Sequence, residues 1–90
     1  MKMVMAIIGK QDTEAVLDTL MEGGYRTTRL ASTGGFLREG NTTLLIGVDD
    51  AQVNPLIDLL RQTVSARNPT PGARGRGAVF VLPLNSFVRL

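Results

Sequence analysis

The sequence predicts a single α+β domain with the element order β-α-β-β-α-β. Short apolar runs of strand length lie near both ends of the chain, and two longer segments repeat apolar residues at helical spacing. Clusters of Gly, Pro and Asn separate these segments, as expected of turns. A chain of 90 residues buries only roughly 60–65% of its unfolded surface, which is too little for two cores. Residues 1–90 are therefore expected to form one domain.

The first strand and the first helix are expected within the first 24 residues. The apolar run Met3–Ile8 is typical of a strand covered on both faces. Asp12 is a candidate helix cap, and Glu14 favours the positive end of the helix dipole. The helical spacing is carried by Val16, Leu17, Leu20 and Met21. The pair Gly23–Gly24 predicts the end of this helix.

Two antiparallel strands are expected in the middle of the chain, at Tyr25–Ser32 and Thr42–Val48. Three glycines in the intervening segment 33–41 permit backbone angles that other residues avoid, so this segment is expected to be a loop. The second helix follows, with one apolar stripe formed by Val53, Leu56, Ile57, Leu60 and Val64. Its start has two candidates, a capping box at Asp49 and Gln52 or Pro55 in the first turn, which a short first turn would reconcile.

The carboxyl-terminal third contains a linker and the last strand. Residues 68–77 are rich in Pro, Gly and Arg and cannot form regular structure for long. Ala78–Leu82 predicts a buried fourth strand that ends at Pro83, and Phe87 is expected to pack back onto the sheet. Two right-handed crossovers then give the ferredoxin-like plan, a four-stranded antiparallel sheet with both helices on one face. Three copies that pack their uncovered faces together would bury the remaining apolar surface.

Composition excludes several classes of function. The chain has neither Cys nor His, so catalytic triads, Cys-His pairs and the usual zinc sites are absent from the sequence. We therefore expect no enzyme, no metal and no cofactor. No apolar stretch approaches the ~20 residues of a membrane span, so a cytoplasmic protein without membrane contact is expected. The net charge of +2 does not indicate nucleic-acid binding.

The segment Gly35–Thr42 nearly matches the phosphate-loop pattern of nucleotide hydrolases. Asn41 stands where that pattern has lysine, and a strand rather than a helix is expected to follow, so nucleotide hydrolysis is not predicted. The same segment offers an apolar surface for a base at Phe36 and Leu37, and Asn41 adds an amide that pairs with an adenine edge. Arg26 and Thr28 are candidates for phosphate contacts. Purely structural roles remain open for each residue, and Phe80 within Val79–Val81 is ordinarily a core residue.

A long stretch of the sequence resembles the PII-like cyclic di-AMP receptors. The resemblance is carried by Tyr25–Arg38, Gly40–Thr43, the opening Met1–Ile7, Ile46–Asp49 and Val79–Pro83. It implies a homotrimeric, non-enzymatic signalling protein that binds cyclic di-AMP at each subunit interface and passes the signal to an unknown protein partner. The implied ligand-binding residues are Arg26, Thr28, Gly35, Phe36, Leu37, Asn41, Gly47 and Phe80.

Two features depart from that family. Residues 68–77 are shorter than the corresponding loop of its members, and Arg89 stands at a position where they have glutamine. Arg89 is retained as a ligand-binding candidate, because its guanidinium can donate to a base or a phosphate although it cannot accept. Two alternatives remain: a PII-like module that binds ATP, ADP or another anion, and an interaction or nucleic-acid module that uses Arg67, Arg74 and Arg76.

Overall fold

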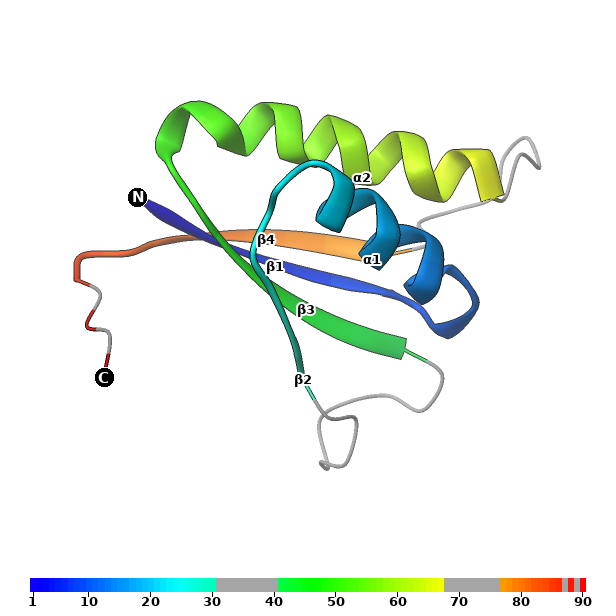
Figure 1. Cartoon of the computed structure of the whole chain (residues 1–90), viewed down its shortest axis with the longest axis horizontal. Helices are drawn as coiled ribbons and strands as arrows, with labels where there is room; N and C mark the ends of the chain where they lie inside the picture. Colours follow the sequence, from blue (N-terminus) through cyan, green and yellow to red (C-terminus); the bar gives the residue numbers. More distant parts are fainter. Residues whose placement is uncertain (31–40, 68–76, 87, 89) are drawn as a thin grey trace.

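The two central strands of the sheet are β1 (Lys2–Gly9) and β3 (Asn41–Val48). The edge strands are β2 (Thr27–Leu30) and β4 (Gly77–Pro83), which gives the order β2-β3-β1-β4 with every neighbouring pair antiparallel. The computed structural model describes residues 1–30, 41–67, 77–86, 88 and 90 (Figure 1). Its element order and strand arrangement confirm the predicted ferredoxin-like plan.

Both helices lie on the same side of the sheet (Figure 1). They are α1 (Thr13–Glu22) and α2 (Val53–Arg67). Because side chains alternate along a strand, every second residue of the central strands points toward the helices. The buried core is formed by Val4, Ala6, Ile8, Val16, Leu20, Leu44, Ile46, Val48, Leu56 and Leu60. The apolar stripe predicted for the second helix therefore faces the sheet, as its spacing indicated.

Short 3-10 turns precede both helices, η1 at Lys10–Asp12 and η2 at Asp50–Gln52. The Asp49 N–H donates to Gln52 Oε1 at 3.4 Å, so Gln52 closes the first turn as predicted and Val53 continues directly into α2. Asp12 makes no capping hydrogen bond to α1, because the chain already turns before the helix begins. At the other end of α1, Gly24 has φ +80° and allows the chain to leave the helix.

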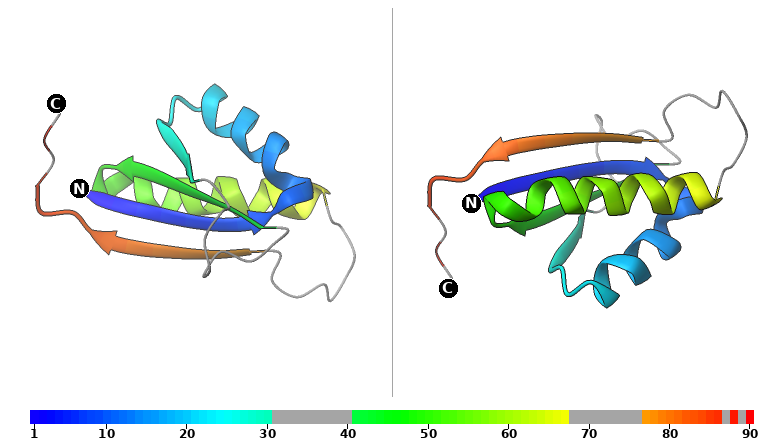
Figure 2. Two further views of the ribbon diagram at one scale, coloured as in Figure 1. Left: turned by 90° about the horizontal axis from the view of Figure 1, so that it is seen from below. Right: turned by 90° about the horizontal axis from the view of Figure 1, so that it is seen from above.

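Besides the cap at Asp12, three local predictions are wrong. The fourth strand was expected to be buried, but all seven residues of β4 are exposed, because β4 is an edge strand and α2 passes over the central strands to one side of it (Figure 2). Met21 was expected in the apolar stripe of the first helix and is 77% exposed. The second strand starts at Thr27 rather than Tyr25. The prediction for Phe87 lies outside the described residues.

Candidate functional site

One side of the sheet is not covered by either helix, and we call it the open face. Along β1 and β3, every second residue points to this side; most of these residues are half-buried, Gly47 is exposed and Thr43 is buried. The cross-strand pairs extend it onto both edge strands. The open face is formed by Met3, Met5, Ile7, Thr28, Leu30, Asn41, Thr43, Leu45, Gly47, Ala78, Phe80 and Leu82. Most of these side chains are apolar, so the surface resembles the inside of a protein more than its outside.

Four residues predicted to bind ligand lie on the open face. Thr28 pairs with Leu45, Asn41 with Gly9, Gly47 with Met3, and Phe80 with Met5. Phe80 is 50% exposed, so the interpretation of this aromatic as a core residue is wrong. The fold thus brings residues from β2, β3 and β4 to one surface.

These four residues do not form one compact cluster. Phe80 and Thr28 lie in one cross-strand row, separated by Met5 and Leu45. Neighbouring strands are ~4.8 Å apart, so their backbones are about 14 Å apart. Asn41 and Gly47 lie at opposite ends of β3, about 20 Å apart at ~3.4 Å per residue. No single base can contact all four residues within one chain.

Gly47 leaves an open space on this surface. A Cβ atom at Gly47 would meet no heavy atom within 4 Å, and the residue is exposed. Thr27 pairs with Ile46 at the start of the β2–β3 ladder. Continuing the same register by one residue places the exposed Arg26 opposite Gly47. Bare backbone beside a guanidinium group is a suitable environment for a phosphate oxygen.

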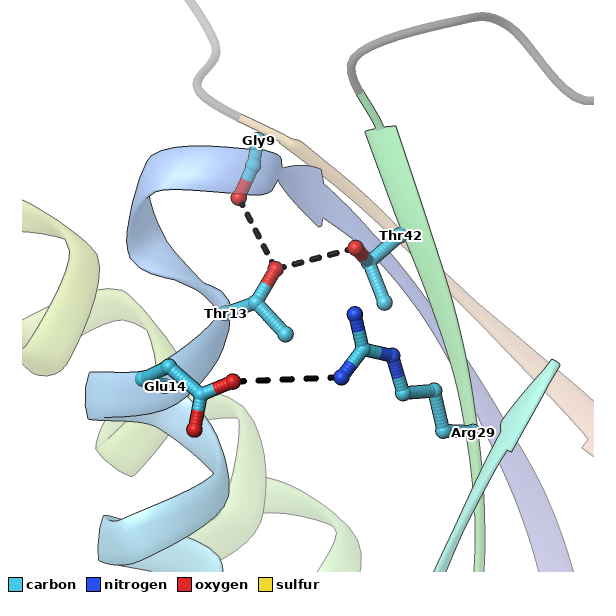
Figure 3. A network of polar contacts seen from close by, with 5 residues as sticks. All are labelled: Gly9, Thr13, Glu14, Arg29 and Thr42. Carbon is cyan, nitrogen blue, oxygen red and sulfur yellow. Dashed lines mark hydrogen bonds and ion pairs between the residues drawn. The ribbon is translucent and has the colours of Figure 1, made fainter. Parts of the chain in front are cut away.

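Thr42, the neighbour of Asn41 in β3, belongs to a polar network at the first turn of α1 (Figure 3). The hydroxyl oxygens of Thr13 and Thr42 are 2.9 Å apart, and Thr13 Oγ1 lies 3.3 Å from the Gly9 carbonyl oxygen. Both threonines are buried, with 2% and 5% of their surface exposed. Sequence reasoning missed both residues, because nothing in the sequence pairs positions 29 residues apart.

The first turn of α1 also contacts β2. Arg29 Nη1 lies 3.8 Å from Glu14 Oε1, with both side chains largely exposed (Figure 3). Thr13 and Glu14 are consecutive residues of α1. Thr13 contacts β3 and Glu14 contacts β2, the strands that follow and precede residues 31–40.

The charged pair at the other end of β1 is separate from these contacts. Asp50 Oδ1 lies 2.9 Å from the Met1 ammonium, and this hydrogen bond, with Lys2 nearby, lowers the pKa of the Asp50 carboxyl. Lys2 pairs with Val48, whereas Gly9 at the opposite end pairs with Asn41.

Within residues 1–30 and 41–67 and the described part of the tail, no group of three His, Cys, Asp or Glu side chains is placed to hold a metal ion. Over the same residues, neither helix is long and apolar enough to cross a membrane.

Several predicted residues lie outside the described part of the chain: Gly35, Phe36, Leu37, Arg74, Arg76 and Arg89. The backbone that follows the glycine-bearing segment is nevertheless clear. Residues 41–48 form β3, a strand, whereas a phosphate loop leads into a helix. The geometry thus agrees with the rejection of a nucleotide-hydrolase motif.

Comparison with known proteins gives three findings. The model of the cyclic-di-AMP receptor family matches residues 1–76. The chain is 30% identical over 97 residues to the nitrogen fixation nifHD region GlnB-like protein 1 of Methanothermococcus thermolithotrophicus, covering 93% of this chain and 88% of that protein. It superimposes with a TM-score of 0.76 and 28% identity on the crystal structure of a functionally unknown protein from Pediococcus pentosaceus, covering 99% and 96% of the two chains. The chain therefore belongs to the cyclic-di-AMP receptor family, whose members are PII-like nucleotide-signalling receptors.

Proposed function

We propose that this protein is a non-enzymatic, cytoplasmic receptor that binds cyclic di-AMP at the clefts between subunits of a homotrimer. Membership of the receptor family supports the class of ligand. The observation that carries the proposal is the position of Thr28, Asn41, Gly47 and Phe80 on the largely apolar face of the sheet that neither helix covers. A bound ligand and neighbouring subunits would both cover this face.

The apolar edge strand supports association. Val79, Phe80, Val81 and Leu82 are each 38–50% exposed. Among the described residues, β4 also has one side without a strand partner, and an exposed, apolar sheet edge favours pairing with another chain. A second copy that covers β4 would bury these four side chains and satisfy its free backbone groups.

The spacing of the site residues supports a shared cleft. Phe80 lies at one edge of the sheet, about 14 Å from Thr28 by the strand spacing, so one base does not reach both in the same chain. In the proposed trimer, Phe80 of one subunit lies beside the β2–β3 side of the next. Binding then needs both subunits, which links ligand occupancy to assembly.

The chemistry of the same residues fits a cyclic dinucleotide. Arg26, Thr28 and the bare backbone at Gly47 suit phosphate and ribose oxygens. The Asn41 amide suits an adenine edge. Asn41 lies about 20 Å from Gly47 along β3, so in the proposed cleft the base contact at Asn41 and the phosphate contact at Gly47 come from different subunits. A ligand with two bases on one ribose-phosphate ring can contact separated groups at once, whereas ATP or ADP carries a single base. This favours cyclic di-AMP over the mononucleotides.

Native mass spectrometry tests assembly and binding together. The protein at micromolar concentration would be measured alone and with cyclic di-AMP, with cyclic di-GMP as the control. We expect a trimer in both cases, with up to three cyclic di-AMP molecules per trimer and no cyclic di-GMP. A monomer that binds cyclic di-AMP would refute the shared cleft, and a trimer that binds neither nucleotide would refute the ligand.

A further inference from the structure

Asn41 is the first residue of β3 and pairs with Gly9, the last residue of β1. Among the described residues, the β1–β3 ladder reaches this pair, and the β2–β3 ladder reaches Leu30 and Thr43. Residues at the end of a strand fray more readily than those in its middle, so side-chain contacts near this end contribute to the position of Asn41.

The other restraint is the side chain of Thr42. Successive strand residues point to opposite faces, so Thr42 points to the helices while Asn41 points to the open face. The Thr42 hydroxyl lies 2.9 Å from that of Thr13, in the first turn of α1. Fixing the Thr42 side chain fixes the backbone from which Asn41 projects.

The hydroxyl of Thr13 takes part in both hydrogen bonds of this network. A hydroxyl carries one proton, and Thr13 Oγ1 is within 3.3 Å of the Gly9 carbonyl, which can only accept. When Thr13 donates to Gly9, Thr42 donates to Thr13, and all three oxygens are used. Removing the Thr13 hydroxyl breaks both contacts, whereas removing that of Thr42 breaks one.

The ion pair beside this network contributes less. Arg29 and Glu14 are 52% and 84% exposed at the side chain, and their nearest charged atoms are 3.8 Å apart. Exposed ion pairs of this length are weak because water and salt screen them. The buried hydrogen bond between Thr13 and Thr42 is therefore expected to be stronger than the exposed ion pair between Glu14 and Arg29.

We propose that Thr13 is a positioning residue for nucleotide binding: through Thr42 it holds Asn41 at the end of β3 in the orientation that contacts a base. This inference rests on the proposed function for its ligand. Thr13 itself faces the helix side of the sheet and does not touch the ligand. Its loss lowers the fraction of molecules in which Asn41 is correctly placed, and affinity falls in proportion to that fraction.

The test compares Thr13→Val, Thr42→Val, the double variant and Thr13→Ser. Valine keeps the branched shape without the hydroxyl, and serine keeps the hydroxyl. Thr19→Val is the matched control, because Thr19 lies in the same helix and donates to the Ala15 carbonyl at 2.9 Å, away from the strands. Each variant is titrated with cyclic di-AMP by calorimetry, and the thermal midpoint of each is measured without ligand.

We expect Thr13→Val to weaken binding about tenfold, the loss that follows if one molecule in ten keeps Asn41 in place. Thr42→Val should weaken binding to a similar degree, because it removes the same contact, and Thr13→Ser should keep the affinity near that of wild type. The double variant separates positioning from stability. It leaves no hydroxyl without a partner, so its midpoint should recover toward wild type while its affinity stays reduced. Recovery of affinity in the double variant, or wild-type affinity in Thr13→Val, would overturn the proposal.

A measurement without ligand keeps the inference separate from the proposed function. Nitrogen-15 relaxation of the Asn41 backbone amide should report a lower order parameter in Thr13→Val than in wild type and Thr19→Val. If wild-type protein binds no cyclic di-AMP but Asn41 loosens as stated, the ligand is wrong and the restraint is upheld. An unchanged order parameter at Asn41 would refute the restraint whatever the ligand.

Discussion

Phe80 lies directly across from Met5 on the open face, although the two residues stand at opposite ends of the sequence. Phe80 is half exposed, and within the described residues the strand that carries it has no partner on its other side. A large apolar side chain in this position fits the proposed assembly, in which a neighbouring subunit covers it.

Replacement of Phe80 tests that relationship. In a single chain, Phe80→Ala removes a half-exposed ring and should cost little, but in an assembly it removes a buried ring worth about 1.5–3 kcal/mol. We expect weaker trimer formation and at least tenfold weaker cyclic di-AMP binding, measured by sedimentation and calorimetry. The comparison is Val79→Ala, because Val79 is the adjacent residue but points to the helix side, so its loss should weaken assembly less and leave the ligand contact intact. Equal effects of the two variants would contradict a specific role for Phe80.

Gly47 offers a test that leaves the fold intact. A Cβ at this position meets open space, and φ is not positive, so alanine fits without strain and valine branches from a Cβ that has no close neighbour. We expect Gly47→Ala and Gly47→Val to leave the thermal midpoint unchanged or higher, because β-branched residues suit strands. Affinity for cyclic di-AMP should fall with side-chain size, since the added atoms occupy the space assigned to the ligand. Wild-type affinity in Gly47→Val would remove Gly47 from the site.

Asn41→Ala tests the proposed base contact. Loss of the amide leaves a base edge without its polar partner, at a cost of about 1–3 kcal/mol, or roughly 5- to 150-fold in affinity. The oligomer should stay intact, because the Asn41 side chain lies at the end of β3. Asn54→Ala is the matched control, since Asn54 is an exposed asparagine of α2. Calorimetry measures the affinity of both variants for cyclic di-AMP. Equal affinities would show that Asn41 does not contact the base.

Thr27 provides a prediction on stability alone. Its hydroxyl oxygen is buried and has no hydrogen-bond partner among the described residues. Valine has the same shape without the polar atom, so Thr27→Val should leave the free energy of unfolding unchanged or raise it by about 1 kcal/mol. Urea denaturation measures this directly. A loss of more than about 1 kcal/mol would show that the hydroxyl has a partner, and Thr28→Val, at an exposed position, controls for the substitution.

The sequence predicted the fold well because its signals are local. Apolar runs, the helical stripe of the second helix and the glycines after the first helix each depend on near neighbours in the chain. The exposure of β4 was not predictable in the same way. Val79–Leu82 has the composition of a buried strand, but its exposure follows from its place at the edge of the sheet, which the order of the strands decides.

The candidate site was predicted only in part. Resemblance to the family supplied Thr28, Asn41, Gly47 and Phe80, and their common face follows from strand alternation once the register is known. The contact between Thr13 and Thr42 depends on how α1 packs against the sheet. No periodicity in the sequence encodes that contact, so it emerged only from the structure.

Isothermal titration calorimetry of the purified protein with cyclic di-AMP, cyclic di-GMP and ATP is the most direct test of the proposed function. We predict saturable binding of one cyclic di-AMP per subunit, with little or no heat from the other two nucleotides. No heat from cyclic di-AMP, or equal heat from all three, would contradict it.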